Sequence, residues 1–167
     1  MEVRIFFSDY NLNIKIKFAE KMEKSKDGKK EPKVTKEVDP NGANKDTHAY
    51  MVMGTRFEVD KKYEIIDPIG SGAYGVVVAA KDTSVAPAKT EGGESNLVAI
   101  KKIVKAFEHR VFSLRTYREL KIQRLLEHEN VLGIKRILKP KNRESFNEIY
   151  VVSELMETDL AQIIKSN

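Results

Sequence analysis

The sequence predicts an α+β domain in which a mainly antiparallel sheet of five strands packs against one major helix. Three observations support this fold class. Short apolar and β-branched segments recur from residue 54 onward, polar or glycine-rich turns separate them, and residues 112–130 have the pattern of a helix. With 167 residues, of which 41% are hydrophobic, the chain can hold one such domain together with tails.

The expected elements follow one another in a simple order. Two apolar segments flank a glycine turn, which predicts a β-hairpin. A long polar connection at residues 82–96, with no assigned role, leads to the third strand, and the helix separates this strand from the last two. In chain order, the expected strands are residues 62–70, 74–82, 97–103, 131–140 and 147–155.

The N-terminal part has a different composition. Residues 1–19 form an extension of unknown role, in which "NLNIKIKF" alternates apolar and polar residues and so predicts one half-buried strand. A single strand needs a partner, and none is identifiable nearby. Residues 20–47 are charged and nearly free of large apolar groups, which predicts a disordered linker because such a segment buries too little surface to offset chain entropy.

The net charge of +5 does not indicate a nucleic-acid partner. Between residues 20 and 46, lysines are nearly balanced by aspartates and glutamates, which is typical of a solvated mixed-charge segment rather than a basic patch. No apolar run is long enough to cross a membrane. Neither nucleic acid nor a membrane is therefore an expected partner.

Cysteine and histidine usage excludes several kinds of site. The chain has no cysteine, so disulfides, thiolate zinc sites and thiol catalysis are excluded. Its three histidines, His48, His109 and His128, are scattered along the sequence, so no metal site is expected from them. The N-terminus does not resemble a secretory signal, and we expect a location in the cytoplasm, the nucleus or both. The oligomeric state is not predicted.

The segment "IGSGAYGVV" contains Gly70, Gly72 and Gly75 in the spacing G-x-G-x-x-G. A dinucleotide-binding loop would lead into a helix, whereas the β-branched residues 76–78 favour a strand. A Walker loop is excluded because no Gly-Lys-Ser/Thr follows. Two interpretations remain at this point: a glycine-rich hairpin over nucleotide phosphates, and an ordinary β-turn whose glycines supply positive φ.

The strand "LVAIKKI" adds a candidate cation to the glycine hairpin. Because side chains alternate along a strand, Ala99 and Lys101 share one face while Lys102 points to the other. A small residue beside a lysine suits a flat purine ring next to a phosphate-binding ammonium. The alternative is that both lysines lie on a solvated sheet edge.

A lysine in a cleft needs a carboxylate, and the predicted helix offers Glu119. Arg115, Glu119, Ile122 and Leu126 form one stripe of that helix, and we expect its apolar members to face the sheet. This orientation would bring Glu119 close to Lys101. The alternative for Glu119 is a solvent-exposed pair with Arg115.

Five strings in order resemble the N-terminal lobe of a eukaryotic protein kinase, and more closely a MAP (mitogen-activated protein) kinase. They are "IGSGAYGVV", "VAIKKI", "RTYRELKI", "HENVLGI" and "YVVSELMETDL", and the resemblance covers roughly residues 54–167. It implies a short N-terminal hairpin at residues 48–62. It also implies that residues 63–167 hold the N-lobe, the hinge and the start of the next helix, without a C-lobe.

The resemblance implies a role for each matching residue in ATP binding. Lys101 would contact the α- and β-phosphates and pair with Glu119, with Lys102 as the alternative register. Ser153 would stand at the gatekeeper position, and the main chain of Glu154 and Met156 would bond adenine. The complete implied nucleotide site is Ile69, Gly70, Ser71, Gly72, Ala73, Tyr74, Gly75, Val76, Val77, Ala99, Lys101, Ser153, Glu154, Met156 and Asp159, the last of these near the ribose.

Further implications concern the helix arginines and the missing lobe. Arg115 and Arg118 are similar to the pair that binds an activation-segment phosphothreonine. No His-Arg-Asp, Asp-Phe-Gly or Ala-Pro-Glu string occurs, so the catalytic aspartate and the Mg²⁺ ligands are expected in an absent C-lobe. Residues from Leu160 onward would begin a helix whose apolar partners lie there.

The expected function is that of the ATP-binding lobe of a serine/threonine kinase acting in a signalling cascade. ATP, protein substrates and upstream kinases would be its partners, although this chain alone is expected to be inactive. The alternative is a natural half-kinase that acts as a non-catalytic binding module.

Overall fold

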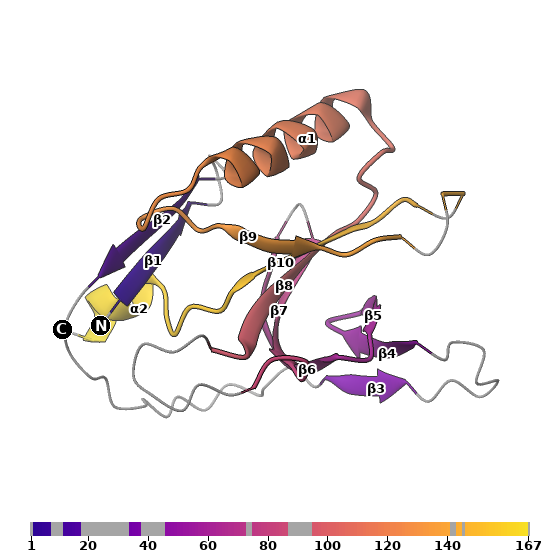
Figure 1. Cartoon of the computed structure of the whole chain (residues 1–167), viewed down its shortest axis with the longest axis horizontal. Coiled ribbons are helices and arrows are strands. Elements are labelled where there is room, and N and C mark those ends of the chain that lie inside the picture. The colour runs from indigo at the N-terminus through magenta and orange to yellow at the C-terminus, as the bar shows by residue number, and fades with distance from the viewer. Residues whose placement is uncertain are drawn as a thin grey trace.

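The computed structural model describes residues 2–7, 12–17, 34–37, 46–72, 75–86, 95–140, 143–144 and 146–166. Its main feature is a five-stranded sheet with the order β6-β7-β8-β10-β9 (Figure 1). All four pairings in this sheet are antiparallel, which confirms the predicted fold class. The strands are β6 (Tyr63–Gly72), β7 (Gly75–Asp82), β8 (Leu97–Ile103), β9 (Ile134–Ile137) and β10 (Ile149–Glu154).

The register of the three central strands defines two faces of the main sheet. Lys101 pairs with Val77 on one side and with Val151 on the other, so these three side chains project from one face. Ile100 lies between Val78 and Val152 and projects from the opposite face. We call the first the Lys101 face and the second the Lys102 face, because the two lysines alternate in the same way.

A second, three-stranded sheet has the order β3-β4-β5, with bounds Thr35–Glu37, Thr47–Val52 and Thr55–Asp60. A two-residue turn joins β4 to β5, and Met53 and Gly54 both have positive φ there, at 50° and 75°. Positive φ at both central residues matches the twist of a tight hairpin. The hairpin spans residues 47–60, so it begins one residue before the expected segment 48–62 and ends inside it.

The main hydrophobic core lies between this hairpin and the Lys102 face. Hairpin and main-sheet residues form one buried cluster in which Phe57, Val78 and Ile100 have no exposed surface. The full cluster is Tyr50, Val52, Phe57, Val59, Tyr63, Ile65, Val76, Val78, Ala80, Val98, Ile100 and Val152.

Helix α1 (Arg110–Leu125) lies on the other side of the main sheet (Figure 1). The cluster beneath it is smaller: Leu120 of the helix packs with Ile103, Ala106, Ile149 and Val151. No residue of α1 is fully buried. The sheet is therefore thickly covered on one face and lightly covered on the other.

In the N-terminal part, the structure adds a partner strand in one segment and a short strand in another. Strand β2 (Leu12–Lys17), predicted without a partner, pairs antiparallel with β1 (Glu2–Phe7). Within the segment 20–47, expected to be disordered, residues 35–37 instead form β3 and pair with β4. Val34, just before β3, packs against the main core, and residues 18–33 and 38–45 lie outside the described part of the chain.

The C-terminal helix α2 (Leu160–Ser166) begins at Leu160, as expected. Asp159 stands just before it and accepts a hydrogen bond at Oδ1 from the backbone N–H of Gln162, at 2.8 Å. This contact caps the helix N-terminus. In the described residues, neither helix is long and apolar enough to span a membrane.

Candidate functional site

An ion pair between Lys101 and Glu119 forms the centre of the candidate site. Lys101 Nζ on β8 lies 3.1 Å from Glu119 Oε1 on α1, within both ion-pair and hydrogen-bond range. The two side chains are 19% and 12% exposed, so the pair is sheltered but still reached by solvent. The structure thus brings together the two residues for which a catalytic role was predicted.

The face of α1 that carries Glu119 is not the one we expected. Ile122 and Leu126, predicted to face the sheet, are 54% and 47% exposed, so that prediction is wrong. Leu120 packs against the sheet instead. Glu119 is the neighbour of Leu120 in sequence and lies at the edge of the inward face, from which its carboxylate reaches Lys101.

The start of α1 explains why this face turns inward. Ser113 Oγ lies 3.0 and 3.1 Å from the carbonyl oxygens of Ala106 and His109, which share its single proton. Ala106 is itself buried in the cluster beneath the helix. Because Ser113 and Leu120 are seven residues apart, two helical turns, the same face is directed at the sheet at both positions.

Gly70 and Gly72 at the end of β6 and Gly75 at the start of β7 have different backbone environments. Gly75 has φ +137°, and a Cβ atom there would stand 1.8 Å from the backbone oxygen of Lys102. At Gly70 and Gly72, φ is not positive, and an added Cβ would meet nothing within 4 Å. The interpretation as an ordinary turn therefore explains Gly75 alone. The open space at Gly70 and Gly72 would let a ligand approach the backbone closely.

The predicted adenine-binding residues lie on two strands beside Lys101. Ala99 pairs with Ser153, so both project from the Lys101 face, and both are partly buried. Val77 pairs directly with Lys101 and is also partly buried. Ile69 is 53% exposed on β6, at a shift in the pairing between β6 and β7.

Several other predicted site residues have different placements. Val76 is 6% exposed and projects from the Lys102 face, so its side chain points away from the candidate site. Glu154 ends β10, and Met156 follows it; both are partly buried. Ser71 is exposed, whereas Ala73 and Tyr74 lie outside the described residues.

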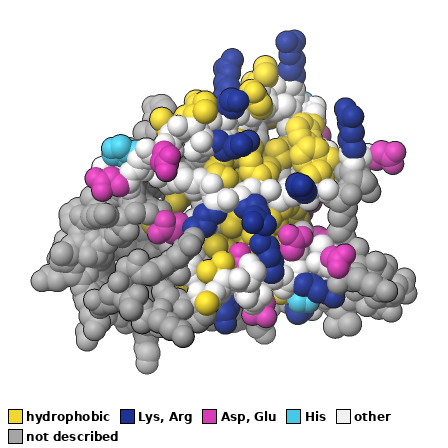
Figure 2. Space-filling model, in the orientation of Figure 1, with side chains coloured by type: hydrophobic (Ala, Val, Ile, Leu, Met, Phe, Trp, Pro, Cys, Tyr) yellow, Lys and Arg dark blue, Asp and Glu magenta, His cyan; other side chains and the backbone are white. Residues whose placement is uncertain are grey.

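Arg115 and Arg118 are exposed on α1. Basic and hydrophobic side chains gather along the top of the molecule in the view of Figure 2, where Figure 1 shows α1. The structure gives Arg115 no part in the Lys101–Glu119 pair. The predicted phosphothreonine contact of these two arginines stays a prediction.

Two features of the site region were missed by sequence reasoning. Asp159, predicted near the ribose, caps α2; its position three residues before Gln162 is the spacing of a capping box and could have signalled this. Lys102, considered as an alternative to Lys101, lies on the opposite face and pairs with Glu148 at 2.7 Å. No local sequence signal links Lys102 to Glu148.

Residues 63–167 match the protein kinase domain family. The chain is 50% identical over 129 residues to mitogen-activated protein kinase 4 of Oryza sativa subsp. japonica, covering 77% of this chain and 32% of that protein. It is 48% identical over 129 residues to mitogen-activated protein kinase 7 of Arabidopsis thaliana, covering 77% and 33%. Over 119 residues it is 50% identical to mitogen-activated protein kinase 6 of the same rice, covering 71% and 29%. The chain spans about a third of the length of these relatives.

Proposed function

Because this chain belongs to the protein kinase family, we propose that residues 63–167 are the ATP-binding lobe of a MAP kinase-like serine/threonine protein kinase. The kinase would transfer the γ-phosphoryl group of ATP to serine or threonine hydroxyls of protein substrates within a signalling cascade. The observation that carries this proposal is the Lys101–Glu119 ion pair on the open face of the sheet.

The ion pair gives Lys101 the properties that phosphate binding requires. Its ammonium is held at the Lys101 face and keeps some solvent access, so it can also contact oxygens of a bound triphosphate. Glu119 balances its charge in the absence of nucleotide and restricts its rotamers. In protein kinases this lysine–glutamate pair must be in place for catalysis.

The glycine hairpin and the end of β10 would complete the half-site. At Gly70 and Gly72 no neighbouring atom fills the space that a Cβ would take, so a ligand could approach the backbone closely there. Ala99 and Ser153 are small, which leaves room for a flat purine on the same face as Lys101. The main chain of Glu154 and Met156 would supply hydrogen bonds to the purine edge.

Mg²⁺ accompanies ATP in this family, but the described residues do not fit it. Among them, no group of three or more histidine, aspartate or glutamate side chains could hold a metal ion. The described residues thus offer no such cluster, and we propose, from the family resemblance, that the protein ligands of Mg²⁺ belong to a C-lobe. Residues 1–167 also lack the His-Arg-Asp and Asp-Phe-Gly strings, so the polypeptide 1–167 would transfer no phosphate by itself.

Calorimetry with ATP and the purified polypeptide 1–167 tests the nucleotide site. We expect weak binding that changes little when Mg²⁺ is added. Lys101→Met should weaken binding by about tenfold, because it removes a charge-assisted hydrogen bond to phosphate. Lys105→Met is the matched control, since Lys105 is 69% exposed and pairs only locally with Glu108.

Three outcomes would count against the proposal. Equal ATP affinities of the wild type and Lys101→Met would show that Lys101 does not contribute to ATP binding. Incorporation of labelled phosphate above background by the polypeptide 1–167 would show that it is active alone. Binding of protein partners without any ATP affinity would favour the alternative of a non-catalytic module.

A further inference from the structure

The second lysine of β8 is buried in an unusual setting. Lys102 is 3% exposed, and its Nζ lies 2.7 Å from Glu148 Oε1, just before β10. The same Nζ donates a hydrogen bond to the backbone oxygen of Arg56 on β5. A buried ammonium is costly unless it is paired, and here its partners come from two separate parts of the fold.

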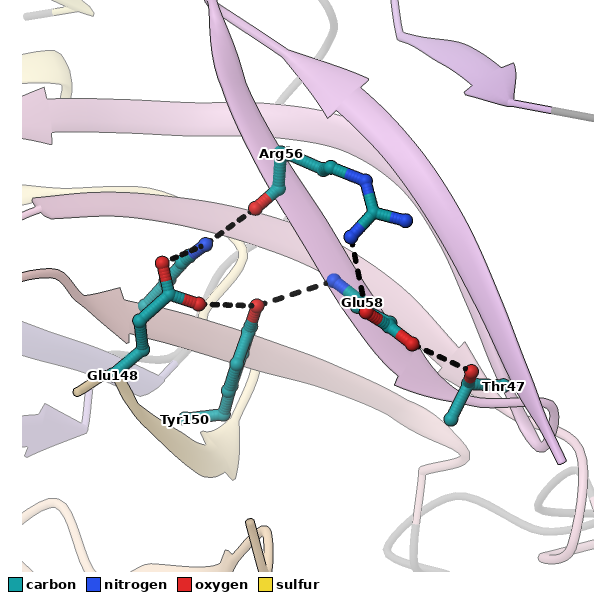
Figure 3. Close-up of polar contacts among 6 residues, drawn as sticks. Thr47, Arg56, Glu58, Glu148 and Tyr150 are labelled. Carbon is teal, nitrogen blue, oxygen red and sulfur yellow. Dashed lines mark hydrogen bonds and ion pairs between the residues drawn. The ribbon is translucent and has the colours of Figure 1, made fainter. Parts of the chain in front are cut away.

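Aromatic rings surround the rest of this ammonium. Its Nζ lies 5.3 Å from the ring centroid of Tyr150 and 5.9 Å from that of Phe57, both within cation–π range. Tyr150 also links Glu148 to β5: its hydroxyl donates to Glu148 Oε2 at 3.4 Å and accepts from the backbone N–H of Glu58 at 3.1 Å (Figure 3). Burial is the main cause of the raised pKa of the Tyr150 phenol, and the Glu148 carboxylate adds to it.

The two backbone groups bound in this way belong to one edge of the hairpin. Arg56 and Glu58 are two residues apart on β5, so their backbone groups point to the same side of the strand. Strand β5 is last in the order β3-β4-β5. Lys102 and Tyr150 therefore occupy the edge of β5, where a further strand would otherwise bind.

The main sheet holds this network firmly. Tyr150 is the direct cross-strand partner of Lys102 between β10 and β8. Any rotation of β8 about its own axis would move Lys102 away from Glu148 and from Arg56 at once. The same rotation would move Lys101, because Lys101 directly precedes Lys102 in β8 and projects from the opposite face of the sheet.

We propose that Lys102 is a positioning residue, which through its contacts with Glu148, Tyr150 and the backbone of Arg56 fixes the orientation of β8 and so holds Lys101 against Glu119. The N-terminal hairpin thereby supports the nucleotide site from the opposite face of the sheet. The functional meaning of this coupling rests on the proposed function, whereas the coupling itself concerns only the geometry of the two lysines.

A role restricted to fold stability predicts a different result from a positioning role. If Lys102 merely stabilised the fold, its removal would lower the unfolding temperature while the Lys101–Glu119 pair in the remaining folded molecules stayed intact. If Lys102 positions Lys101, the pair itself must loosen in the folded state. Reactivity of the Lys101 amine measures this directly, because pairing with Glu119 shields it.

The test is trace acetylation of the polypeptide 1–167 by acetic anhydride, without nucleotide, at a temperature where circular dichroism shows each variant to be folded. Mass spectrometry gives the initial rate at Lys101. We expect Lys102→Met to raise this rate by about threefold or more, as coupled neighbouring residues do. Lys102→Arg should restore much of the protection, and the exposed control Lys105→Met should change nothing.

Glu148→Gln provides a second route if Lys102→Met does not fold. Its side chain is 43% exposed, so the substitution should be tolerated, and it removes the charge that faces Lys102. We expect a smaller rise in the Lys101 rate, about twofold. In a Glu119→Gln background, Lys102→Met should add no further increase, because the pair through which it acts is already weakened.

Unchanged Lys101 reactivity in folded Lys102→Met or Glu148→Gln would overturn the proposal. If Lys102→Met raised the Lys101 acetylation rate just as much in the Glu119→Gln background, the proposal would also be overturned. Lys102 would then affect the solvent accessibility of Lys101 and not its pairing with Glu119. ATP calorimetry on the same samples separates the two proposals. A wild type that binds no ATP but shows the expected coupling would overturn the proposed function and leave the positioning role of Lys102 supported.

Discussion

The two faces of the main sheet differ in how completely they are covered. On the Lys102 face, Phe57 of the hairpin and Ile100 of the main sheet belong to one buried cluster and have no exposed surface. On the Lys101 face, helix α1 contributes no fully buried residue, and Leu125 is 71% exposed. The closed face provides most of the packing, and the open face presents the candidate site.

This difference gives two neighbouring lysines opposite environments. Lys102 is enclosed with Glu148 and two aromatic rings, whereas Lys101 meets Glu119 where solvent still reaches. Because side chains alternate between the two faces of a strand, Lys101 and Lys102 occupy consecutive positions and still lie in different environments. A buried ion pair and a solvent-accessible one are thereby separated across one strand.

The largest expected effect comes from opening the closed face. Phe57→Ala should lower the free energy of unfolding by about 3–5 kcal/mol, because it leaves a cavity in the core beneath the hairpin. On the open face, Leu125→Ala should change it by less than about 0.5 kcal/mol. Urea unfolding followed by circular dichroism measures both. Comparable losses for the two variants would show that the faces contribute equally.

A backbone clash should produce the next largest effect. Gly75→Ala would place a Cβ 1.8 Å from the Lys102 oxygen at a φ of +137°, so we expect a loss of about 2 kcal/mol or more. Gly72→Ala adds a Cβ into open space and should cost less than about 1 kcal/mol. Thermal unfolding of the two variants provides the comparison. A Gly72 variant as unstable as the Gly75 variant would contradict the distinct roles of these glycines.

Alkaline pH should weaken the closed face through Tyr150. Burial raises the pKa of its phenol in the folded protein, so its contribution to stability is complete below the unfolded pKa of about 10 and is lost as the pH rises toward the folded value. By about pH 11 the loss should be about 1 kcal/mol. The unfolding free energy measured from pH 8 to 11 should fall less steeply in Tyr150→Phe. If the unfolding free energies of the wild type and Tyr150→Phe fell in parallel with pH, Tyr150 would not be the cause of the alkaline loss of stability.

The smallest expected effect on stability lies at the open face. Glu119→Gln keeps an oxygen that can accept from Lys101 but removes the charge, and the pair is partly solvated. We expect the free energy of unfolding to fall by less than about 1 kcal/mol. Urea unfolding measures the change, and a loss as large as that of Phe57→Ala would mean that the open face also holds the fold together.

Much of the candidate site could be predicted from local sequence. The β-branched residues 76–78 favour a strand after the glycine loop, and β7 begins at Gly75. Alternation along "LVAIKKI" separated Lys101 from Lys102, and the structure places the two lysines on opposite faces. Both patterns depend only on neighbouring residues, which is why they could be read without a structure.

The orientation of α1 could not be predicted in the same way. Its sequence has apolar residues on several sides, including Val111, Leu120, Ile122 and Leu125, so no single stripe identifies the inward face. The contact of Ser113 with Ala106 and the packing of Leu120 select that face. The expected pair of Lys101 and Glu119 is present, although Ile122 and Leu126, which were expected to turn Glu119 toward the sheet, are exposed.

By itself, the sequence determined the fold class, the order of the five main-sheet strands along the chain and the family, because these depend on local patterns and on matching motifs in order. Only the tertiary structure decided which face of α1 turns inward and what encloses Lys102. The contacts around Lys102 join residues far apart in sequence: 46 positions separate it from Arg56, and 92 separate Glu58 from Tyr150. No local pattern encodes such contacts, because they form only when the hairpin packs on the finished sheet.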